Sequence, residues 1–380
     1  MQYSIPGYLW MVTDEVRVDA YACALRSVIT PESFVVEIGT GIGVFAVMAK
    51  QLGARRVVAI EPSDAISVAR MVAQDNGAEV EFIQALSTDV SFPERADVVV
   101  SDLRGVLPLF NGHLQSIIDA RERFLAPGGA LIPAADTLYA AVVEIPKRYD
   151  ERTPAFSADG TVKLGALRRF MTNTWEKTSF KPDELLTQPA VWATIDYRVI
   201  TGPDVTGTAR FGVERDGTAH GIAVWFDATL VDGVTFSNAP NQSESIYGSA
   251  FFPWPEPVSV RRGDHVCVRI DARHVGDEYL WRWDSEVRAA DSSSAPAKRF
   301  QQSTFHGAPI VPAKLAKGDA AAAAVLGVDG HVERFILQAM DGTATNGHIA
   351  RLLLDRFPGL FRGPSDALAR AGSVARRFGT

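Results

Sequence analysis

Residues 34–46 read FVVEIGTGIGVFA, an apolar run followed by three alternating glycines and then by a helical pattern. The β-branched residues of the run favour a strand that is buried on both faces. Gly39, Gly41 and Gly43 follow it, and glycine there lets the backbone approach a ligand closely while the first amides of the next helix point at it. The stretch therefore predicts a strand, loop and helix that bind a nucleotide-like cofactor.

The chain on either side of this stretch shows two different periodicities. From Phe34 to about Val143, short apolar runs alternate with longer helical periods, which predicts a doubly wound, mostly parallel α/β sheet. After about Glu144, period-two alternation dominates, as in VWATIDYRVI and VSVRRGDHVCVRIDA. That pattern predicts an antiparallel sandwich or β-barrel.

The C-terminal third begins with a polar segment and ends with helical periodicity. AADSSSAPAKRFQQSTFHG, residues 289–307, is small, polar and interrupted by proline, as linkers are. Beyond Val332 apolar residues recur at helical spacing, and Thr345 is placed to cap a helix. The predicted boundaries are 1–143 for the sheet domain, 144–290 for the barrel, 291–330 for the linker and 331–380 for a small helical module.

Carboxylates near the glycines narrow the choice of cofactor. Glu61 ends the next strand, in VVAIEPS, where one carboxylate can accept hydrogen bonds from two ribose hydroxyls. The glycines are spaced two and two, unlike the G-x-G-x-x-G of dinucleotide dehydrogenases, which favours S-adenosylmethionine over a nicotinamide. A tight turn without a ligand, and a solvated strand end at Glu61, are the alternatives. Besides the three glycines and Glu61, we expect the following residues in this site: Glu37, Thr40, Pro62, Ser87 and Thr88.

Composition excludes several other classes of function. The net charge of −7 over 380 residues argues against binding nucleic acid through bulk electrostatics. Cys23 and Cys267 are far apart and the seven histidines are scattered, so no metal site is predicted. No apolar window is long enough for a membrane helix, and MQYSIPGYLW lacks the basic start of a signal peptide. We therefore expect a cytoplasmic protein.

Several segments together resemble the protein arginine methyltransferases, over roughly residues 5–290. They are MVTDEVRVDAY at 11–21, FLAPGGALIPAADTLYAAVVE at 124–144 and HGIAVWFDATL at 220–230. The resemblance implies an S-adenosylmethionine-dependent methyltransferase that acts on a peptide or protein, with Arg17 pairing with the methionine carboxylate. It also implies a homodimer bridged by an arm near residues 165–179.

The substrate loop departs from that family's pattern. The family has two glutamates, whereas SDLRGVLPLFNGHL at 101–114 has Asp102 and Asn111 in the matching positions. Arg104 stands where the family has an uncharged residue, and a cation there would repel a substrate guanidinium by about 1 kcal/mol or more. The family's threonine-histidine-tryptophan loop matches Ser245–Tyr247, which lacks the histidine. We predict Asp102, Arg104 and Asn111 as the catalytic loop, with Asp102 orienting the nucleophile.

The tail weakly resembles small winged-helix domains that bind precursor peptides, through FILQAMDGTATNGHIARLLLDRF at 335–357. A helical cap with solvated arginines is the alternative. For the whole chain we predict an S-adenosylmethionine-dependent methyltransferase acting on a peptide or protein. The alternatives are an arginine N-methyltransferase and a cofactor-binding regulatory protein without turnover.

Overall fold

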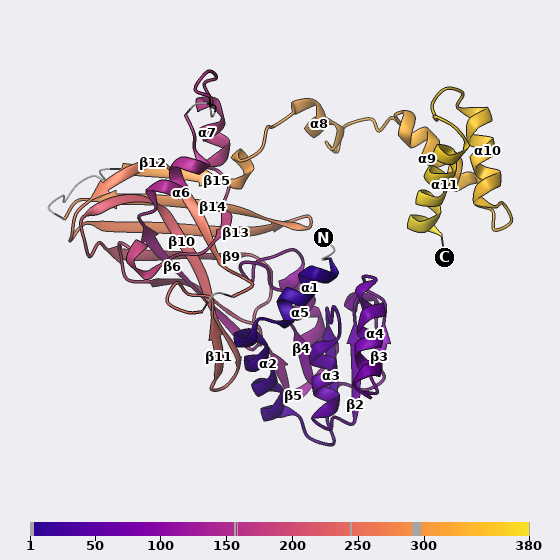
Figure 1. Ribbon diagram of the computed structural model, residues 1–380, viewed down its shortest axis with the longest axis horizontal. Helices are drawn as coiled ribbons and strands as arrows, with labels where there is room; N and C mark the ends of the chain where they lie inside the picture. Colours follow the sequence, from indigo (N-terminus) through magenta and orange to yellow (C-terminus); the bar gives the residue numbers. More distant parts are fainter. Residues whose placement is uncertain (1–3, 156, 158, 244, 291–297, 380) are drawn as a thin grey trace. The chain divides into compact units, whose positions relative to one another are not determined.

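The fold was obtained as a computed structural model, which describes residues 4–155, 157, 159–243, 245–290 and 298–379 (Figure 1). A five-stranded parallel sheet has the order β3-β2-β1-β4-β5, so the prediction of a doubly wound domain is confirmed. Its strands are β1 (Phe34–Ile38), β2 (Arg56–Ile60), β3 (Glu81–Ile83), β4 (Ala96–Ser101) and β5 (Leu125–Ile132). The chain leaves the middle of this sheet in opposite directions at β1 and β4, and ligands of open sheets bind at such a switch point.

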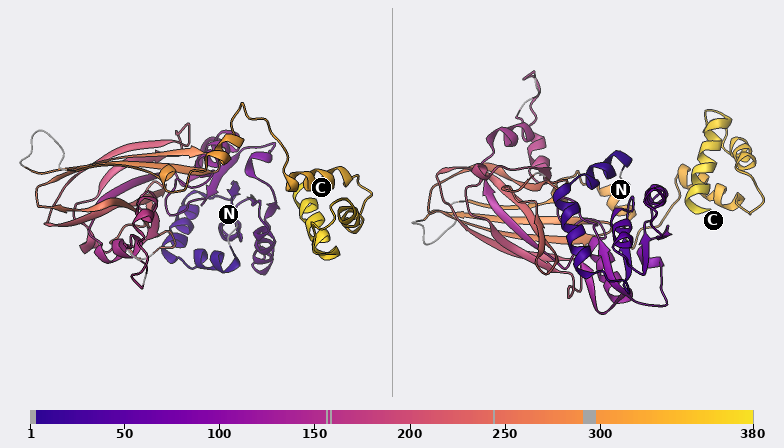
Figure 2. Two further views of the ribbon diagram at one scale, coloured as in Figure 1. Left: turned by 90° about the horizontal axis from the view of Figure 1, so that it is seen from above. Right: turned by 60° about the horizontal axis from the view of Figure 1, so that its bottom comes forward.

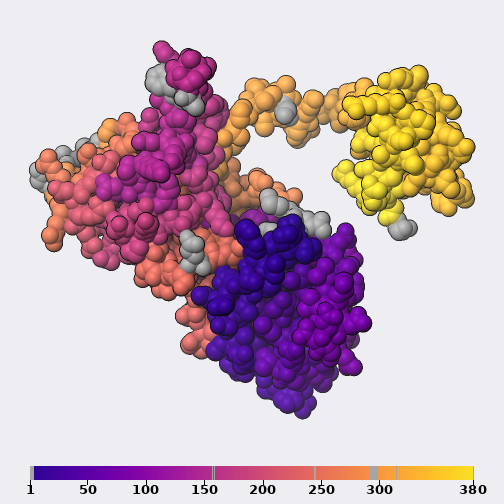
Figure 3. Space-filling view, viewed as in Figure 1, coloured from indigo at the N-terminus to yellow at the C-terminus, as the bar shows by residue number. Residues whose placement is uncertain are grey.

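Helices cover both faces of this sheet and its carboxyl edge. They are α1 (Ile5–Val12), α2 (Glu15–Val28), α3 (Val44–Gln51), α4 (Ala65–Asp75) and α5 (His113–Arg123), with a 3-10 turn η1 (Ser87–Asp89). All five residues of β1 are buried, as its apolar run predicts. The indigo N-terminal helices form part of the visible surface of this domain in Figure 3.

Two antiparallel sheets form the barrel. The first contains β7 (Glu176–Thr178), β12 (Ser249–Val260), β10 (Gly217–Val231), β6 (Ala135–Val143) and β8 (Ala190–Asp196), with β11 (Val234–Ser237) paired to β10. The second has the order β15 (Lys298–Ser303), β14 (Glu278–Arg288), β13 (His265–Val275) and β9 (Val205–Gly212). Burial alternates along β13, which confirms the period-two prediction. In Figure 2 the long orange strands of the second sheet lie alongside one another.

Two predicted boundaries need correction. β6 begins at Ala135, so the barrel starts before residue 144. β15 pairs with β14 over residues 298–303, inside the predicted linker 291–330. The first compact unit, which contains both the sheet domain and the barrel, extends to Pro309, and the second runs from Ile310 to the C-terminus. Residues 291–297 of the predicted linker lie outside the described residues.

The predicted arm, residues 165–179, contains α7 (Gly165–Met171) and the strand β7, and α7 projects from the barrel in Figure 1. The helix α6 (Pro146–Arg152) precedes the arm and the 3-10 turn η2 (Pro182–Glu184) follows it. Leu167 and Met171 are exposed. Trp175 lies within the predicted arm, whose apolar residues we expected to pack on a partner subunit, but it packs inside this chain's own barrel, with its ring centroid 6.1 Å from that of Phe252.

The C-terminal unit is helical, as predicted. It contains α8 (Pro312–Lys317), α9 (Val328–Ala339), α10 (Asn346–Arg356) and α11 (Pro364–Phe378), and a 3-10 turn η3 (Thr304–His306) precedes it. Thr345 caps α10 by accepting a hydrogen bond from the amide of His348, which confirms the predicted cap. Ile336, Ile349 and Leu353 form its core. Residues 327–379 are all described, and they contain helices without the β-hairpin of a winged helix.

Within the described residues, no helix has the length and apolar character needed to cross a membrane. The same residues contain no group of three or more histidine, cysteine, aspartate or glutamate side chains arranged to hold a metal ion.

Candidate functional site

The glycine loop lies at the carboxyl end of β1 and is approached closely from two sides. Gly39, Gly41 and Gly43 all have positive φ angles, of 70°, 55° and 84°, which other residues adopt only with strain. A Cβ at Gly41 would lie 2.6 Å from the ring of Tyr8, and one at Gly39 would lie 2.1 Å from Leu103. The loop is therefore a cradle between α1 and the loop after β4, and only glycine fits it.

Two buried carboxylates line the base of this loop. Glu61 accepts hydrogen bonds from the amides of Gly41 and Ser63, each at 3.0 Å. Glu37 accepts one from the hydroxyl of Thr40 at 2.6 Å. Burial raises the pKa of Glu37 to about 8, although the bond from Thr40 opposes this shift. A cationic group bound beside Glu37 would favour its ionised form.

The remaining predicted cofactor residues follow the neighbouring strands. Pro62 comes directly after Glu61 and is exposed, and Ser87 and Thr88 lie in η1, beyond the end of β3. Arg123 holds this turn by donating a hydrogen bond to the carbonyl oxygen of Ser87 at 2.8 Å. All these loops leave the same carboxyl edge of the parallel sheet as the glycine loop.

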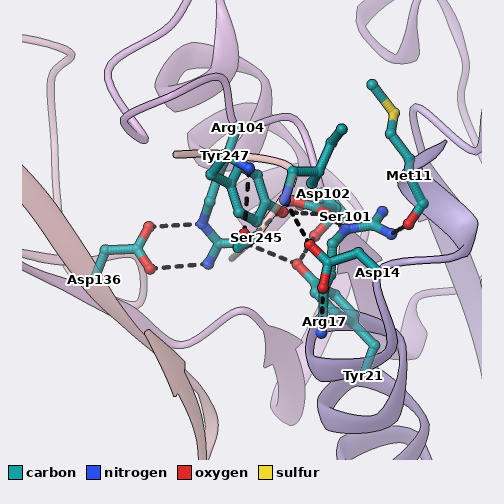
Figure 4. A network of polar contacts seen from close by, with 11 residues as sticks. Met11, Asp14, Arg17, Tyr21, Ser101, Asp102, Arg104, Asp136, Ser245 and Tyr247 are labelled. Carbon is teal, nitrogen blue, oxygen red and sulfur yellow. Dashed lines mark hydrogen bonds and ion pairs between the residues drawn. The ribbon is translucent and has the colours of Figure 1, made fainter. Parts of the chain in front are cut away.

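Arg17 lies in the first turn of α2, which Asp14 caps by accepting a hydrogen bond from the Arg17 amide. Its Nε donates to Oδ2 of Asp102 at 2.5 Å, and its Nη1 donates to the carbonyl oxygen of Met11 at 2.8 Å (Figure 4). The guanidinium carbon lies 5.0 Å from the ring centroid of Phe45. Although burial opposes it, the charge of Asp102 raises the pKa of Arg17. α2 therefore delivers a fixed cation to the site.

Asp102 follows β4 directly and is surrounded by donors. Besides Arg17, the Tyr247 hydroxyl donates to it at 2.6 Å and Nη1 of Arg104 donates to its Oδ1 at 3.2 Å (Figure 4). Burial alone would raise the pKa of Asp102, but the two guanidinium groups and the Tyr247 hydroxyl hold that pKa below its usual value. Asp102 is thus a carboxylate at neutral pH.

Arg104 points away from the cofactor loop and into the barrel. Its Nε and Nη2 donate to the two carboxylate oxygens of Asp136 in β6, each at 2.9 Å, and its Nη1 donates to the Tyr21 hydroxyl at 2.8 Å. The side chains of Arg104 and Asp136 are both fully buried. Of the two roles expected for Arg104, pairing with Asp102 or contacting an anionic part of the substrate, the structure shows the first, because its donors bind groups of this chain.

Two family models match the chain. One, described as a methyltransferase domain, matches residues 35–129, which span the parallel sheet and its glycine loop. Residues 35–129 are therefore a class I S-adenosylmethionine-dependent methyltransferase domain. The second model, an arginine methyltransferase oligomerization subdomain, matches the barrel over residues 134–281.

Known proteins and solved structures show the same resemblance to the arginine methyltransferases. A probable protein arginine N-methyltransferase 6 from Arabidopsis thaliana is 30% identical over 63% of this chain, but the match covers only 57% of that protein. Protein arginine N-methyltransferase 6 from Xenopus tropicalis is 28% identical over 67% of this chain and 80% of its own length.

The solved structures share the fold at lower identity. Arabidopsis thaliana protein arginine methyltransferase 10, described in a uniquely open conformation, gives a TM-score of 0.69 at 21% identity and covers 79% of this chain and 98% of its own. The Trypanosoma brucei arginine methyltransferase 1 enzyme–prozyme heterotetramer with S-adenosylhomocysteine gives a TM-score of 0.71 at 16% identity, covering 78% and 96%.

The cofactor of this methyltransferase is S-adenosylmethionine, and the site fits it. Gly39, Gly41 and Gly43 place no side chain over the backbone of the loop, and Glu61 offers a carboxylate at the strand end where ribose hydroxyls bind. The predicted role of Arg17, as partner of the methionine carboxylate, fits the cation found there, and the ionisable group of Glu37 would suit the ammonium.

Asn111, the third residue predicted in the catalytic loop, makes none of the described hydrogen bonds to Asp102. Its backbone has a φ of 43°, a left-handed conformation that asparagine tolerates better than most residues do. Among the described hydrogen bonds, those around Asp102 join Arg17, Arg104 and Tyr247 and do not include Asn111.

Sequence reasoning missed three members of the methyltransferase's polar network: Tyr21, Asp136 and Tyr197. The Tyr21 hydroxyl donates to the carbonyl oxygen of Ser101 at 2.9 Å, and the Tyr197 hydroxyl donates to Asp136. A lone aspartate inside the apolar run PAADTLYAAVV was the one available signal for Asp136. The loop at Ser245–Tyr247, which lacks the family's histidine, instead binds Asp14 through the amide of Ile246 at 2.8 Å.

Replacing Glu61 with alanine should weaken binding of S-adenosylhomocysteine by about 1.5 to 3 kcal/mol, because it removes charge-assisted hydrogen bonds to two hydroxyls. Isothermal titration calorimetry measures this change. Glu81→Ala is the matched control, because Glu81 lies on the adjacent strand and pairs with Arg56 on the surface. Equal affinity of the Glu61 and Glu81 variants would remove Glu61 from the cofactor site.

Proposed function

We propose that this methyltransferase methylates the guanidinium group of an arginine side chain in a peptide or protein. The observation that carries the proposal is Asp102, a buried carboxylate at the carboxyl end of β4, beside the glycine loop. The named relatives, which are arginine N-methyltransferases, support the same chemistry.

Asp102 would bind and orient the nucleophile. A guanidinium N–H donates well to an ionised carboxylate, and the low pKa of Asp102 keeps it ionised. The cofactor, when bound, supplies a methyl group on a sulfonium. Transfer would form the nitrogen–methyl bond as the carbon–sulfur bond of the sulfonium breaks, and one N–H proton would pass to the Asp102 carboxylate and on to solvent. Because its lowered pKa makes Asp102 a weak base, holding the nitrogen in line is its main contribution.

Arg17 would connect the cofactor to this carboxylate. Its Nε donates to Asp102 and its Nη1 to the carbonyl oxygen of Met11, so Nη2 is the group that would bind the methionine carboxylate. The Tyr247 hydroxyl fixes the same oxygen of Asp102 from the barrel side. The carboxylate is thus held by both domains, which limits its motion during transfer.

The cation at Arg104 does not oppose an arginine substrate. Both oxygens of Asp136 neutralise it, and its side chain is fully buried. The repulsion of about 1 kcal/mol or more expected from an unpaired cation is therefore cancelled by a carboxylate that is closer to it than any substrate would be.

Methyl transfer to peptides tests the proposal directly. The full chain is incubated with methyl-labelled S-adenosylmethionine and a glycine-rich peptide containing one arginine. The control peptide, its citrulline twin, has the same sequence with citrulline in place of arginine, which keeps the shape of the side chain and removes the charge. We expect methylarginine in the arginine peptide and no label in the twin. Label on another residue type in a proteome digest, with none on arginine, would contradict the proposal.

A second candidate is a regulatory protein that binds the cofactor without turnover. It is favoured by the three donors that already occupy Asp102, and by Asn111 in place of a second acid. Cofactor binding by calorimetry together with no labelled product in a lysate would support this candidate instead.

We also propose that the protein is a cytoplasmic homodimer whose arm binds a partner subunit. The exposed Leu167 and Met171 on α7 and the matched oligomerization subdomain support this assembly. A monomeric mass in light scattering at micromolar concentration would contradict it. The free cysteines Cys23 and Cys267 suit a reducing compartment.

A further inference from the structure

A cavity of about 510 Å³ lies on the outer face of the first barrel sheet, away from the glycine loop. Strands β6 and β10 form its floor, the segment from Pro182 to Pro189 forms one wall, and the segment from Ser237 to Gln242 forms the other. The network around Asp102 does not use these residues, and no role has yet been assigned to them.

Two aromatic rings form part of the floor. Trp225 and Tyr139 are cross-strand partners, and their rings are nearly parallel, with centroids 6.1 Å apart and an interplanar angle of 13°. Trp225 is 2% exposed and belongs to a small core with Phe251 and Tyr149. The ring pair is thus fixed in place, and fixed aromatic faces attract planar cations.

A carboxylate stands beside the rings without a counter-charge. Asp227 lies two residues from Trp225 on the same face of β10, and its Oδ1 is buried with no hydrogen-bond partner among the described residues. Burial raises the pKa of the neighbouring Tyr139 hydroxyl, and the charge of Asp227 raises it further. An unpaired buried carboxylate oxygen is costly, so its presence suggests a ligand that supplies the missing donor.

The other polar groups around the cavity also favour a cation. Glu214 lines it and accepts a hydrogen bond from Gln188 at 2.8 Å. Asn241 and Gln242 add amide groups. The described lining residues include two carboxylates and no lysine or arginine.

We infer that this cavity binds the side chain of a second arginine in the substrate peptide, distinct from the arginine that is methylated. A guanidinium is flat enough to stack on the partly exposed ring of Tyr139, which Trp225 holds in place, and its N–H groups match the open oxygen of Asp227. A lysine ammonium offers neither the flat face nor the fork of donors. The inference rests on the proposed function for the identity of the substrate, but the cavity's preference for a guanidinium stands by itself.

One connection joins the cavity to the catalytic loop. The residues from Ser237 to Gln242 begin the same β11–β12 segment that ends at Tyr247, which binds Asp102. Within it, Asn238 accepts a hydrogen bond from the amide of Phe226 at 2.8 Å and donates to the carbonyl oxygen of Val106 at 3.5 Å. A peptide bound in the cavity would therefore contact the segment that carries Tyr247, which holds the Asp102 carboxylate in place.

Binding of a small guanidinium probe tests the inference. Acetyl-Gly-Gly-Arg-Gly-Gly-amide is titrated by calorimetry into the full chain and into its Asp102→Asn variant, which lacks the carboxylate proposed to bind the methylated arginine. The peptide with citrulline in place of arginine is titrated in parallel. Asp227→Asn and Glu214→Gln should each weaken binding at least tenfold, and the twin should not bind measurably. Asp232→Asn is the matched control, because Asp232 is an exposed carboxylate in the turn after β10 and does not line the cavity.

The outcomes separate the cavity from the catalytic site. Probe binding should persist in Asp102→Asn, and Asp227→Asn should keep or raise the melting temperature, because it removes an unpaired buried charge. In methylation of a two-arginine peptide, Asp227→Asn should raise KM about tenfold at unchanged kcat. Equal probe affinity in the Asp227 and Asp232 variants, or equal binding of the citrulline twin, would overturn the inference. If no arginine is methylated while probe binding holds, the proposed function fails and the cavity assignment survives.

Discussion

Replacing Asp136 with asparagine is expected to lower the free energy of unfolding by about 3 to 5 kcal/mol. The change would leave the fully buried Arg104 without its bidentate partner, and the Tyr197 hydroxyl would lose the carboxylate to which it donates. Urea unfolding followed by circular dichroism measures the loss. Because Asp136 belongs to β6 and Arg104 to the loop after β4, the destabilisation should affect both domains in one transition.

Asp271→Asn provides the control for that measurement. Asp271 also pairs with an arginine on a barrel strand, Arg269, but that arginine is exposed, and exposed pairs contribute little to stability. A loss at Asp136 no larger than the loss at Asp271 would mean that the buried pair does not hold the two domains together.

Asp102→Asn is expected to lower kcat by about ten- to a thousand-fold, because the amide keeps the size of the side chain but loses the charge that orients the nucleophile. Affinity for S-adenosylhomocysteine should fall much less, since Glu61 and the glycine loop are unchanged. Single-turnover methylation of the arginine peptide and calorimetry give the two quantities.

Asp102→Glu distinguishes charge from geometry. It restores the residue type found at this position in the arginine methyltransferases, so we expect it to retain most of the activity. Wild-type turnover in Asp102→Asn would show that the loop is only a wall of the pocket. Loss of the folded state in Asp102→Asn, seen in the same unfolding assay, would instead show a structural role between Arg17 and Arg104.

The cofactor site could be predicted from sequence because its parts are local. The strand, the glycines and the acid at Glu61 are all contained within residues 34–61, and their spacing is fixed by one strand, one loop and one helix. The barrel was predictable for a similar reason, since alternation with period two is visible within each strand. What these patterns do not encode is which strand ends face one another across the two domains.

The misassigned parts depend on contacts between distant segments. β15 reads as a linker because KRFQQS has one apolar residue, yet Gln302 is buried through its hydrogen bonds to backbone carbonyl groups at Thr172 and Pro253. The pairing of Arg104 with Asp136 was not predicted because the two residues lie 32 positions apart in the sequence. The start of the barrel was missed because only two residues separate β5 from β6, so no change of composition marks it.

The pair formed by Arg104 and Asp136 also limits how this loop can have evolved. Replacing either partner alone leaves an unpaired charge in the interior, and such a destabilised intermediate is selected against. A lineage that has an uncharged residue at position 104 must therefore exchange both positions nearly together. Once acquired, the pair makes its own reversal difficult, so the cation in the substrate loop is expected to persist even while residues that touch substrate continue to change.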